Sequence, residues 1–414
     1  MDPAYVPVKG FDMMFRMARY VTLFGAALLA ALTSVEGVAG QGGGRGSAVP
    51  VTPGGECPPG TTLVRVGQCQ APGFPPPSIV DYRPASLLKV EQHPVPRAKF
   101  PVVDIHSHTG PTPQNIDQLI KEMDALNIRV LNNLSGGFGP ELKQRVDYIR
   151  TTKYANRFTL FANGLDRFRD VEPGYGKRAA AQLEQDVKNG AVGFKIFKET
   201  GMDTLKKDGT RLKISDPELA PIWETAGRLN IPVIVHTAEP QAFFDPLDMH
   251  NERWLELALF PDRRQYLNKN VSFDLLMSER DDLFKKHPKT RFISAHFGWH
   301  GHDLGRAGKL LDEHPNVTLE LAAILYDLGR QPRTAHDFFV KYQDRILFGK
   351  DTYAPSEFPY YWRVLETRDE YFDYYRDYHA FWQLYGMQLP DAVLRKVYHQ
   401  NALKVTPGLP QTGW

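Results

Sequence analysis

The chain has 414 residues, of which 42% are hydrophobic and 24% are charged, and its formal net charge is +2. This length suffices for one large domain or two ordinary ones, and the composition is that of a globular protein. Because neither sign of charge dominates and the two signs are interspersed after residue 100, the composition gives no support to a nucleic-acid partner.

The N-terminus has the pattern of an export signal. Three basic residues precede an uncharged, mostly apolar run at 20–35, and the small residues Val38-Ala39-Gly40 follow it. This order is typical of a cleaved signal peptide, which we assign to residues 1–40, so we expect an exported protein, periplasmic or secreted. An uncleaved membrane anchor is the alternative. The run falls short of the roughly 20 apolar residues of a span, so we expect no stable membrane span after cleavage.

Residues 41–100 are rich in glycine and proline, which predicts an extension of coil ahead of the main domain. The two cysteines of the chain, Cys57 and Cys69, both lie there. In an oxidising compartment we expect them to form a disulfide, which would stabilise this extension by about 3 kcal/mol in the chain-entropy model.

From residue 101 to about 405 the pattern alternates between strands and helices, and residues 406–414 form a C-terminal tail. Eight runs have the length and residue types of strands, at 102–108, 128–134, 158–164, 191–197, 232–236, 291–296, 317–321 and 345–351. Amphipathic stretches predict helices at 116–126, 178–188, 217–229, 280–287, 304–314 and 335–342. This alternation favours a (β/α)8 TIM barrel. The rival is an open doubly wound sheet, but no strand is followed by the G-x-G-x-x-G of dinucleotide binding.

Two stretches interrupt the repeat, and both predict helical insertions. Residues 239–270 follow the fifth strand, and the aromatic-rich residues 352–389 follow the eighth. Both leave the carboxyl end of a strand, where TIM barrels place their active sites. We expect most of the aromatic residues to pack the core of these insertions and the others to line a substrate pocket.

The first strand carries the first sign of chemistry. Because side chains alternate along a strand, Asp104, His106 and His108 are expected to point to one side at its carboxyl end. Two imidazoles that project into one space form half of a metal site, although two histidines that merely end a strand would look the same.

Polar residues at other strand ends complete the set. Lys195, His236, His296 and Asp351 stand at or beside the carboxyl ends of strands four, five, six and eight. A barrel brings these ends to one rim, so the residues should surround one cavity. Four or five nitrogen and oxygen ligands there would hold a divalent cation, zinc being the first choice and Mn²⁺, Fe²⁺ or Co²⁺ the others.

This combination resembles the amidohydrolase superfamily, and in particular its amidohydrolase 2 (amidohydrolase-related) branch of metal-dependent hydrolases and decarboxylases. The resemblance rests on D-x-H-x-H at 104–108 together with the later histidines and aspartate, and it covers residues 101 to about 405. It implies an auxiliary histidine at His296. It also implies a metal held by four residues, His106, His108, His236 and Asp351.

Lys195 leaves the number of metal ions open. Superfamily members with two ions bridge them with a carboxylated lysine on strand four, where Lys195 stands. In the alternative, the lysine contacts substrate or supports the ligands. We favour this alternative, and with it one ion over two. Lys350 replaces a residue that is often small in the superfamily, and alternation predicts that its side chain faces away from the metal.

These parts predict a metal-dependent hydrolase. As an amide, cyclic amide or lactone bond of a small molecule is cleaved, Asp351 is expected to take a proton from a metal-activated water. His296 is expected either to stabilise the developing oxyanion or to hydrogen-bond the nucleophile. The alternative is a metal-dependent decarboxylase of an aromatic or unsaturated carboxylic acid. A third reading is an exported barrel that binds metal or ligand without turnover. A homodimer is compatible with each.

Other polar residues near the predicted strand ends are weaker candidates. Glu239 and Arg333 are candidate substrate contacts, although solvated side chains are the ordinary alternative for both. Asp104 either orients a histidine of the first strand or plays an interior structural role. We expect His300 and His302 to be surface residues.

Overall fold

The computed structural model describes residues 48–164, 171–268, 271–379 and 381–414. The chain divides into two compact units, residues 1–82 and 83–414. The expected signal peptide at 1–40 lies outside the described residues. Among the described residues, no helix has the length and apolar character needed to cross a membrane.

The described part of the first unit contains a small antiparallel sheet that the sequence analysis did not anticipate. Its strands are β1 (Ala48–Pro50), β2 (Thr62–Arg65) and β3 (Gln68–Gln70), in the order β1-β3-β2. A disulfide joins Cys57 to Cys69, which is fully buried on the central strand. The expected coil is therefore interrupted by a small stapled sheet.

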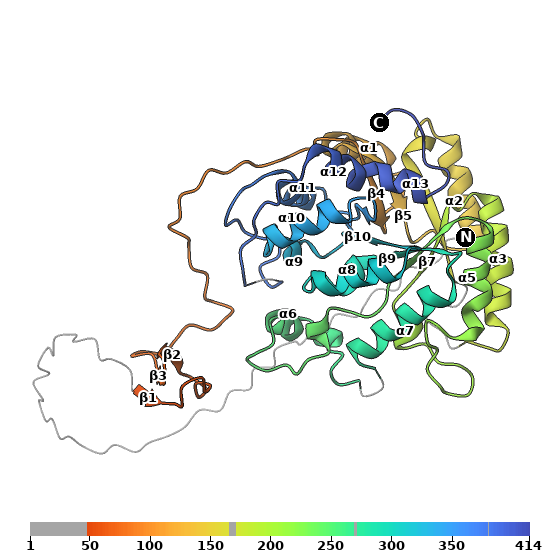
Figure 1. The fold of residues 1–414 in the computed structure, drawn as a ribbon. Coiled ribbons are helices and arrows are strands. Elements are labelled where there is room, and N and C mark those ends of the chain that lie inside the picture. The colour runs from red at the N-terminus through yellow and green to blue at the C-terminus, as the bar shows by residue number, and fades with distance from the viewer. Residues whose placement is uncertain (1–47, 165–170, 269–270, 380) are drawn as a thin grey trace, which may run out of the picture. The chain divides into compact units, whose positions relative to one another are not determined.

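The second unit is built on eight parallel strands in consecutive order, which confirms the predicted TIM barrel (Figure 1). They are β4 (Val102–Ser107), β5 (Ile128–Asn133), β6 (Phe158–Asn163), β7 (Gly193–Ile196), β8 (Pro232–Val235), β9 (Arg291–Ser294), β10 (Val317–Glu320) and β11 (Ile346–Leu347). A parallel bridge between Ser107 and Asp351 and a 3.1 Å bond from the Ile105 amide to the Phe348 carbonyl join the first strand to the last. The last strand is shorter than the predicted 345–351, and beyond its end the backbone of Asp351 has a φ of +78°.

Helices surround the strands, which are buried on nearly every residue and so are covered on both faces. They are α1 (Ile116–Leu126), α2 (Gly139–Thr151), α3 (Tyr175–Asn189), α4 (Glu199–Met202), α5 (Ala220–Arg228), α6 (Trp254–Leu259), α7 (Phe273–Lys286), α8 (Leu304–Glu313), α9 (Leu325–Gly329), α10 (Pro332–Lys341), α11 (Phe358–Glu366), α12 (Asp391–Arg395) and α13 (Asn401–Val405). Helix α2 was not predicted, although Leu142, Val146 and Ile149 have helical spacing and are buried. Helix α7 begins seven residues before the predicted 280, because Ser272 caps it by accepting the Leu275 amide.

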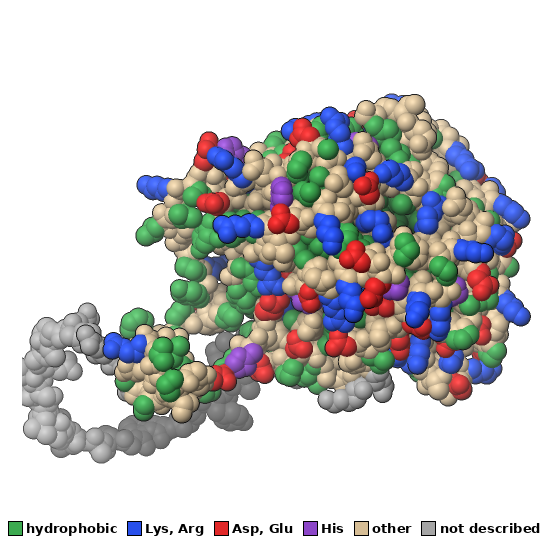
Figure 2. All heavy atoms as spheres, in the orientation of Figure 1, with side chains coloured by type: hydrophobic (Ala, Val, Ile, Leu, Met, Phe, Trp, Pro, Cys, Tyr) green, Lys and Arg blue, Asp and Glu red, His purple; other side chains and the backbone are tan. Residues whose placement is uncertain are grey.

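The insertion after β11 packs largely as core, as the sequence predicts. Phe358, Tyr361 and Trp362 of α11 are fully buried, whereas Tyr371 and Phe381 are exposed. On the visible face of the barrel unit, basic and acidic side chains are interspersed (Figure 2), as the balanced net charge suggests.

Candidate metal centre

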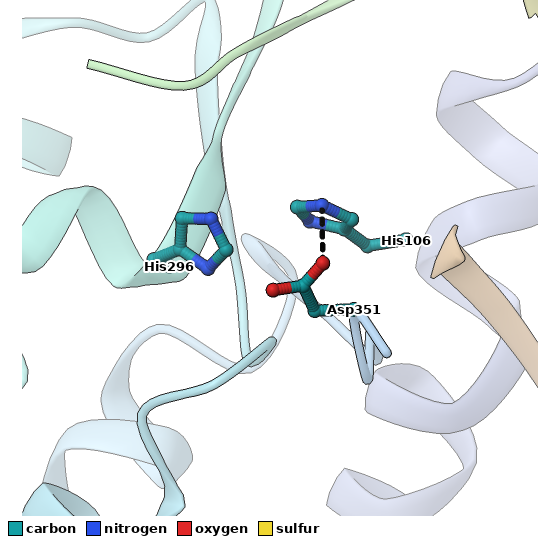
Figure 3. A group of neighbouring side chains, drawn as sticks. All are labelled: His106, His296 and Asp351. Atoms are coloured by element: carbon teal, nitrogen blue, oxygen red, sulfur yellow. Dashed lines mark ion pairs between the residues drawn. The ribbon is translucent and has the colours of Figure 1, made fainter. Parts of the chain in front are cut away.

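Three buried or partly buried side chains from three strand ends meet at one point of the barrel rim (Figure 3). His106 lies on β4, His296 follows β9, and Asp351 follows β11. One ligand atom of each lies within 4.8 Å of the others, a spacing that could hold one metal ion. The Nε2 atom of His106 is 3.7 Å from Oδ1 of Asp351.

The other two predicted histidines adjoin this group. His108 places Nε2 3.3 Å from Oδ1 of Asp351, while its Nδ1 is 2.8 Å from the Ser135 hydroxyl. His236 places Nδ1 3.4 Å from Nε2 of His296. Its own Nε2 is buried without a hydrogen-bond partner among the described residues. Two of the four predicted ligands, His106 and Asp351, therefore lie in the group together with His296. The other two, His108 and His236, lie beside it and contact Asp351 and His296.

Glu320, at the end of β10, orients two of these residues. Its carboxylate accepts a hydrogen bond from Nδ1 of His106 at 2.8 Å, from the His296 amide at 2.7 Å and from the Ala322 amide at 2.7 Å. A proton on Nδ1 of His106 leaves the lone pair on Nε2, which faces Asp351. From its place at the end of the seventh strand, the sequence leaves open whether Glu320 faces the mouth of the barrel or forms a core ion pair. The structure places its carboxylate against His106 and the His296 amide.

Two roles were predicted for Asp104, and the structure shows the interior structural one. It is fully buried, and Oδ1 accepts the amides of His106 and Lys350, each at 3.1 Å. It therefore ties the first strand to the last, whereas the imidazole of His106 is oriented by Glu320 instead.

Burial sets the protonation states of the centre. Burial lowers the pKa values of His106 and His236 well below the ordinary value, and that of His296 to about 4. Burial alone would raise the pKa of Asp351, but the hydrogen bond from His108 holds it below its usual range. Near neutral pH these three imidazoles are therefore neutral and the Asp351 carboxylate is ionised. These are the donor types and protonation states that a divalent cation requires, so the residues fit one.

Two members of the group stand on left-handed backbone. Asp351 has a φ of +78°, and the turn after β9 has φ values of +55°, +56°, +62° and +54° from His296 to Trp299. Buried Arg280 of α7 supports that turn by donating to the Gly298 carbonyl at 2.8 Å. The Trp299 ring stacks on His296 with 4.5 Å between ring centroids. Such conformations are unfavourable for residues with side chains, and they concentrate at functional sites.

A family model described as amidohydrolase matches residues 103–407. The chain belongs to the amidohydrolase family. Membership, together with a residue group that fits a divalent cation, indicates a metal-dependent enzyme and leaves its reaction open. Among curated proteins, none matches the sequence significantly.

Solved structures with a similar fold were also found. A 2,6-dihydroxybenzoate decarboxylase from Rhizobium is 16% identical, covering 74% of this amidohydrolase and 98% of its own chain at a TM-score of 0.44. A dihydroxybenzoic acid decarboxylase from Polaromonas sp. JS666, with bound manganese and the inhibitor 2-nitroresorcinol, is 15% identical. The match covers 74% of this chain and 96% of that chain at a TM-score of 0.46. A 4-oxalomesaconate hydratase from Rhodopseudomonas palustris is 15% identical, and the match covers 74% of this chain and 95% of that chain at a TM-score of 0.41. At these identities and TM-scores the likenesses bear on neither the reaction nor the metal of this chain.

The remaining candidates of the amidohydrolase lie in three different settings. Lys195 is fully buried on β7. Burial of His106 is the main cause of its low pKa, and the charge of Lys195 is the second cause, so Lys195 belongs to the centre. Glu239 is buried and forms an ion pair with Lys198. Arg333 is exposed on α10 and lines a surface cavity of about 700 Å³ whose lining includes none of the predicted metal ligands.

The expectation that His300 is a surface residue is wrong. His300 is 1% exposed, its Nε2 lies 3.2 Å from Nη2 of Arg280, and burial lowers its pKa to about 2. The turn after β9 packs against α7, and no periodicity in the loop sequence predicts that contact. His302 is exposed as expected and interacts with Gln241 at 3.0 Å.

Proposed function

We propose that this amidohydrolase is an exported hydrolase that uses a divalent cation, zinc before Mn²⁺, Fe²⁺ or Co²⁺, to cleave an amide, cyclic amide or lactone bond of a small molecule. The observation that carries the proposal is the meeting of neutral imidazoles with one ionised carboxylate at the barrel rim. His106, His108, His236 and Asp351 are the proposed ligands. When bound, such a cation polarises a carbonyl and lowers the pKa of water towards neutrality.

Asp351 is the proposed proton carrier. It is ionised at working pH and reaches the centre from the last strand, so an Oδ atom is available to accept a proton from the attacking water and deliver it to the leaving group.

The hydrogen bonds of His296 favour one of the two roles expected from the sequence. Its Nδ1 lies 2.9 Å from the Ala322 carbonyl, which can only accept, so a neutral ring carries its proton there. Nε2 then holds a lone pair and cannot donate to an oxyanion. We therefore propose that Nε2 of His296 accepts a hydrogen bond from the attacking water or serves as a further metal ligand.

The first test is Asp351→Asn in metal-loaded protein, assayed on a panel of amides, cyclic amides and lactones. We expect turnover to fall about 100- to 10,000-fold because the proton acceptor is lost while the side-chain volume is kept. Exposed Asp373→Asn is the matched control and should behave as wild type. Turnover of Asp351→Asn at the wild-type rate would contradict the proposal.

The same assay separates the two reactions. Carbon dioxide released from carboxylated aromatic compounds, without any hydrolysis product from the panel, would replace the proposed hydrolase activity by the decarboxylase activity.

Elemental analysis decides the metal count: we propose one ion per chain, and two would assign Lys195 a bridging role. Export is tested by mass spectrometry of the mature N-terminus, since an intact Met1 in the exported fraction would contradict cleavage.

A further inference from the structure

Lys350, immediately before Asp351, is a buried lysine with an unusual set of neighbours. Its side chain is 1% exposed. The Nζ atom lies between 5.3 and 5.7 Å from the ring centroids of Phe358, Tyr361 and Tyr375. These rings belong to α11 and the insertion after β11, and so the side chain points into the insertion, as the alternation along the strand predicts.

The polar contacts of Lys350 lie on both sides of Asp351. Its ammonium group donates to the Thr352 carbonyl at 3.0 Å and forms an ion pair with Glu357. Its amide donates to the Asp104 carboxylate at 3.1 Å. The residue before Asp351 and the residue after it are thus linked by one side chain, so the intervening turn cannot relax freely.

The turn needs such support. Asp351 has a φ of +78°, a left-handed conformation that is unfavourable for a residue with a side chain. The Asp351 amide donates to the His106 carbonyl at 2.6 Å, which fixes one side of the peptide. The bond from Lys350 to Thr352 fixes the other side.

We propose that Lys350 is a positioning residue, whose ammonium group, held by Glu357 and three aromatic rings, keeps the Asp351 turn left-handed so that the carboxylate faces His106 and His108. This inference rests on the proposed role of Asp351. Packing alone would not require a lysine: a buried ion pair commonly contributes no more stability than apolar residues of similar volume. A methionine could fill a pocket walled by aromatic rings, but it could not donate to Thr352.

The test uses Lys350→Met/Glu357→Gln, which removes both charges together and so leaves no buried carboxylate unpaired. Metal affinity is measured on apo protein by Mn²⁺ titration, with free Mn²⁺ read from its EPR signal. The visible absorption of Co²⁺-loaded protein reports the ligand geometry. Arg211→Met/Glu279→Gln, at a largely buried ion pair that includes none of the proposed ligands, is the matched control. Lys350→Met alone is the second variant.

We expect the Mn²⁺ dissociation constant of Lys350→Met/Glu357→Gln to rise about 10- to 100-fold, as when a residue that orients a ligand is lost. The Co²⁺ spectrum should change, whereas the control variant keeps both properties of wild type. A folded Lys350 variant, single or double, with wild-type affinity and spectrum would overturn the proposal. If both variants failed to fold, Lys350 would be a structural residue and the proposal would also be rejected. Asp351→Asn distinguishes failure of this inference from failure of the proposed function, because wild-type turnover of that variant rejects the proposed function itself.

Discussion

The two sides of the metal centre are held by different kinds of backbone. His106 stands on β4, an extended strand, where alternation alone directs its side chain to the rim. His296 and Asp351 stand on left-handed turns, where nothing in the local backbone preference favours the observed direction. The difference teaches that the strand directs its side chain to the rim without further support of the backbone, whereas the turn side depends on other contacts to hold its backbone.

Those contacts come from two buried cations. Arg280 of α7 holds the turn that carries His296, and Lys350 holds the turn that carries Asp351. Glu320 is common to both sides, because its carboxylate binds His106 and the amide of His296. Substitutions at these supports should therefore affect the two sides unequally, which the following predictions examine.

The largest effect is expected at the residue that both sides share. Glu320→Gln replaces an acceptor of three hydrogen bonds by a group that must point an amide N–H towards one of the three donors. We expect metal affinity to fall about 10- to 100-fold, measured by titration of apo protein with Mn²⁺. Glu366→Gln is the control, since that partly buried carboxylate binds Lys99 and Tyr398 outside the centre. Equal affinities in the two variants would show that the centre does not need the Glu320 charge.

A smaller effect is expected where only the turn side is disturbed. Arg280→Lys keeps the charge but cannot reach the Gly298 carbonyl and His300 together, as the guanidinium does. We expect about tenfold weaker metal binding and about 1–3 kcal/mol of lost stability.

The control for Arg280→Lys is Arg345→Lys, since Arg345 also donates to backbone carbonyls, those of Val317 and His314, away from the rim. If Arg280→Lys lost stability but kept wild-type metal affinity, the support would serve the fold and not His296.

These supports mark the limit of what the sequence predicts. Alternation on the first strand and the eight-strand repeat suffice for the barrel, for His106 and His108, and for the rim positions of His236, His296 and Asp351. The hydrogen-bond partners of Glu320 and Arg280 and the buried state of His300 depend on contacts between segments 18 or more residues apart, for which a single sequence has no periodic signal. The left-handed turns are equally hidden, because only one of the five residues involved is a glycine.

The smallest predicted effect concerns pH and compares the turn with a buried histidine outside the centre. Burial lowers the pKa of His296 to about 4 and that of His379, in the insertion after β11, also to about 4, from an ordinary 6.5. Between these values the unfolded chain binds protons that the folded chain does not, so the free energy of unfolding should fall as pH drops from 6.5 towards 4.

Denaturant unfolding of metal-free protein across this pH range measures the slope. Because each histidine contributes separately, His296→Asn and His379→Gln should each flatten the slope, and the double variant should flatten it further. A slope unchanged by His296→Asn but reduced by His379→Gln would mean that His296 is already protonated in the metal-free fold. The turn side would then reach its neutral, ligand-ready state only when a cation binds, and it would not be preorganised as the contacts of Arg280 and Glu320 imply.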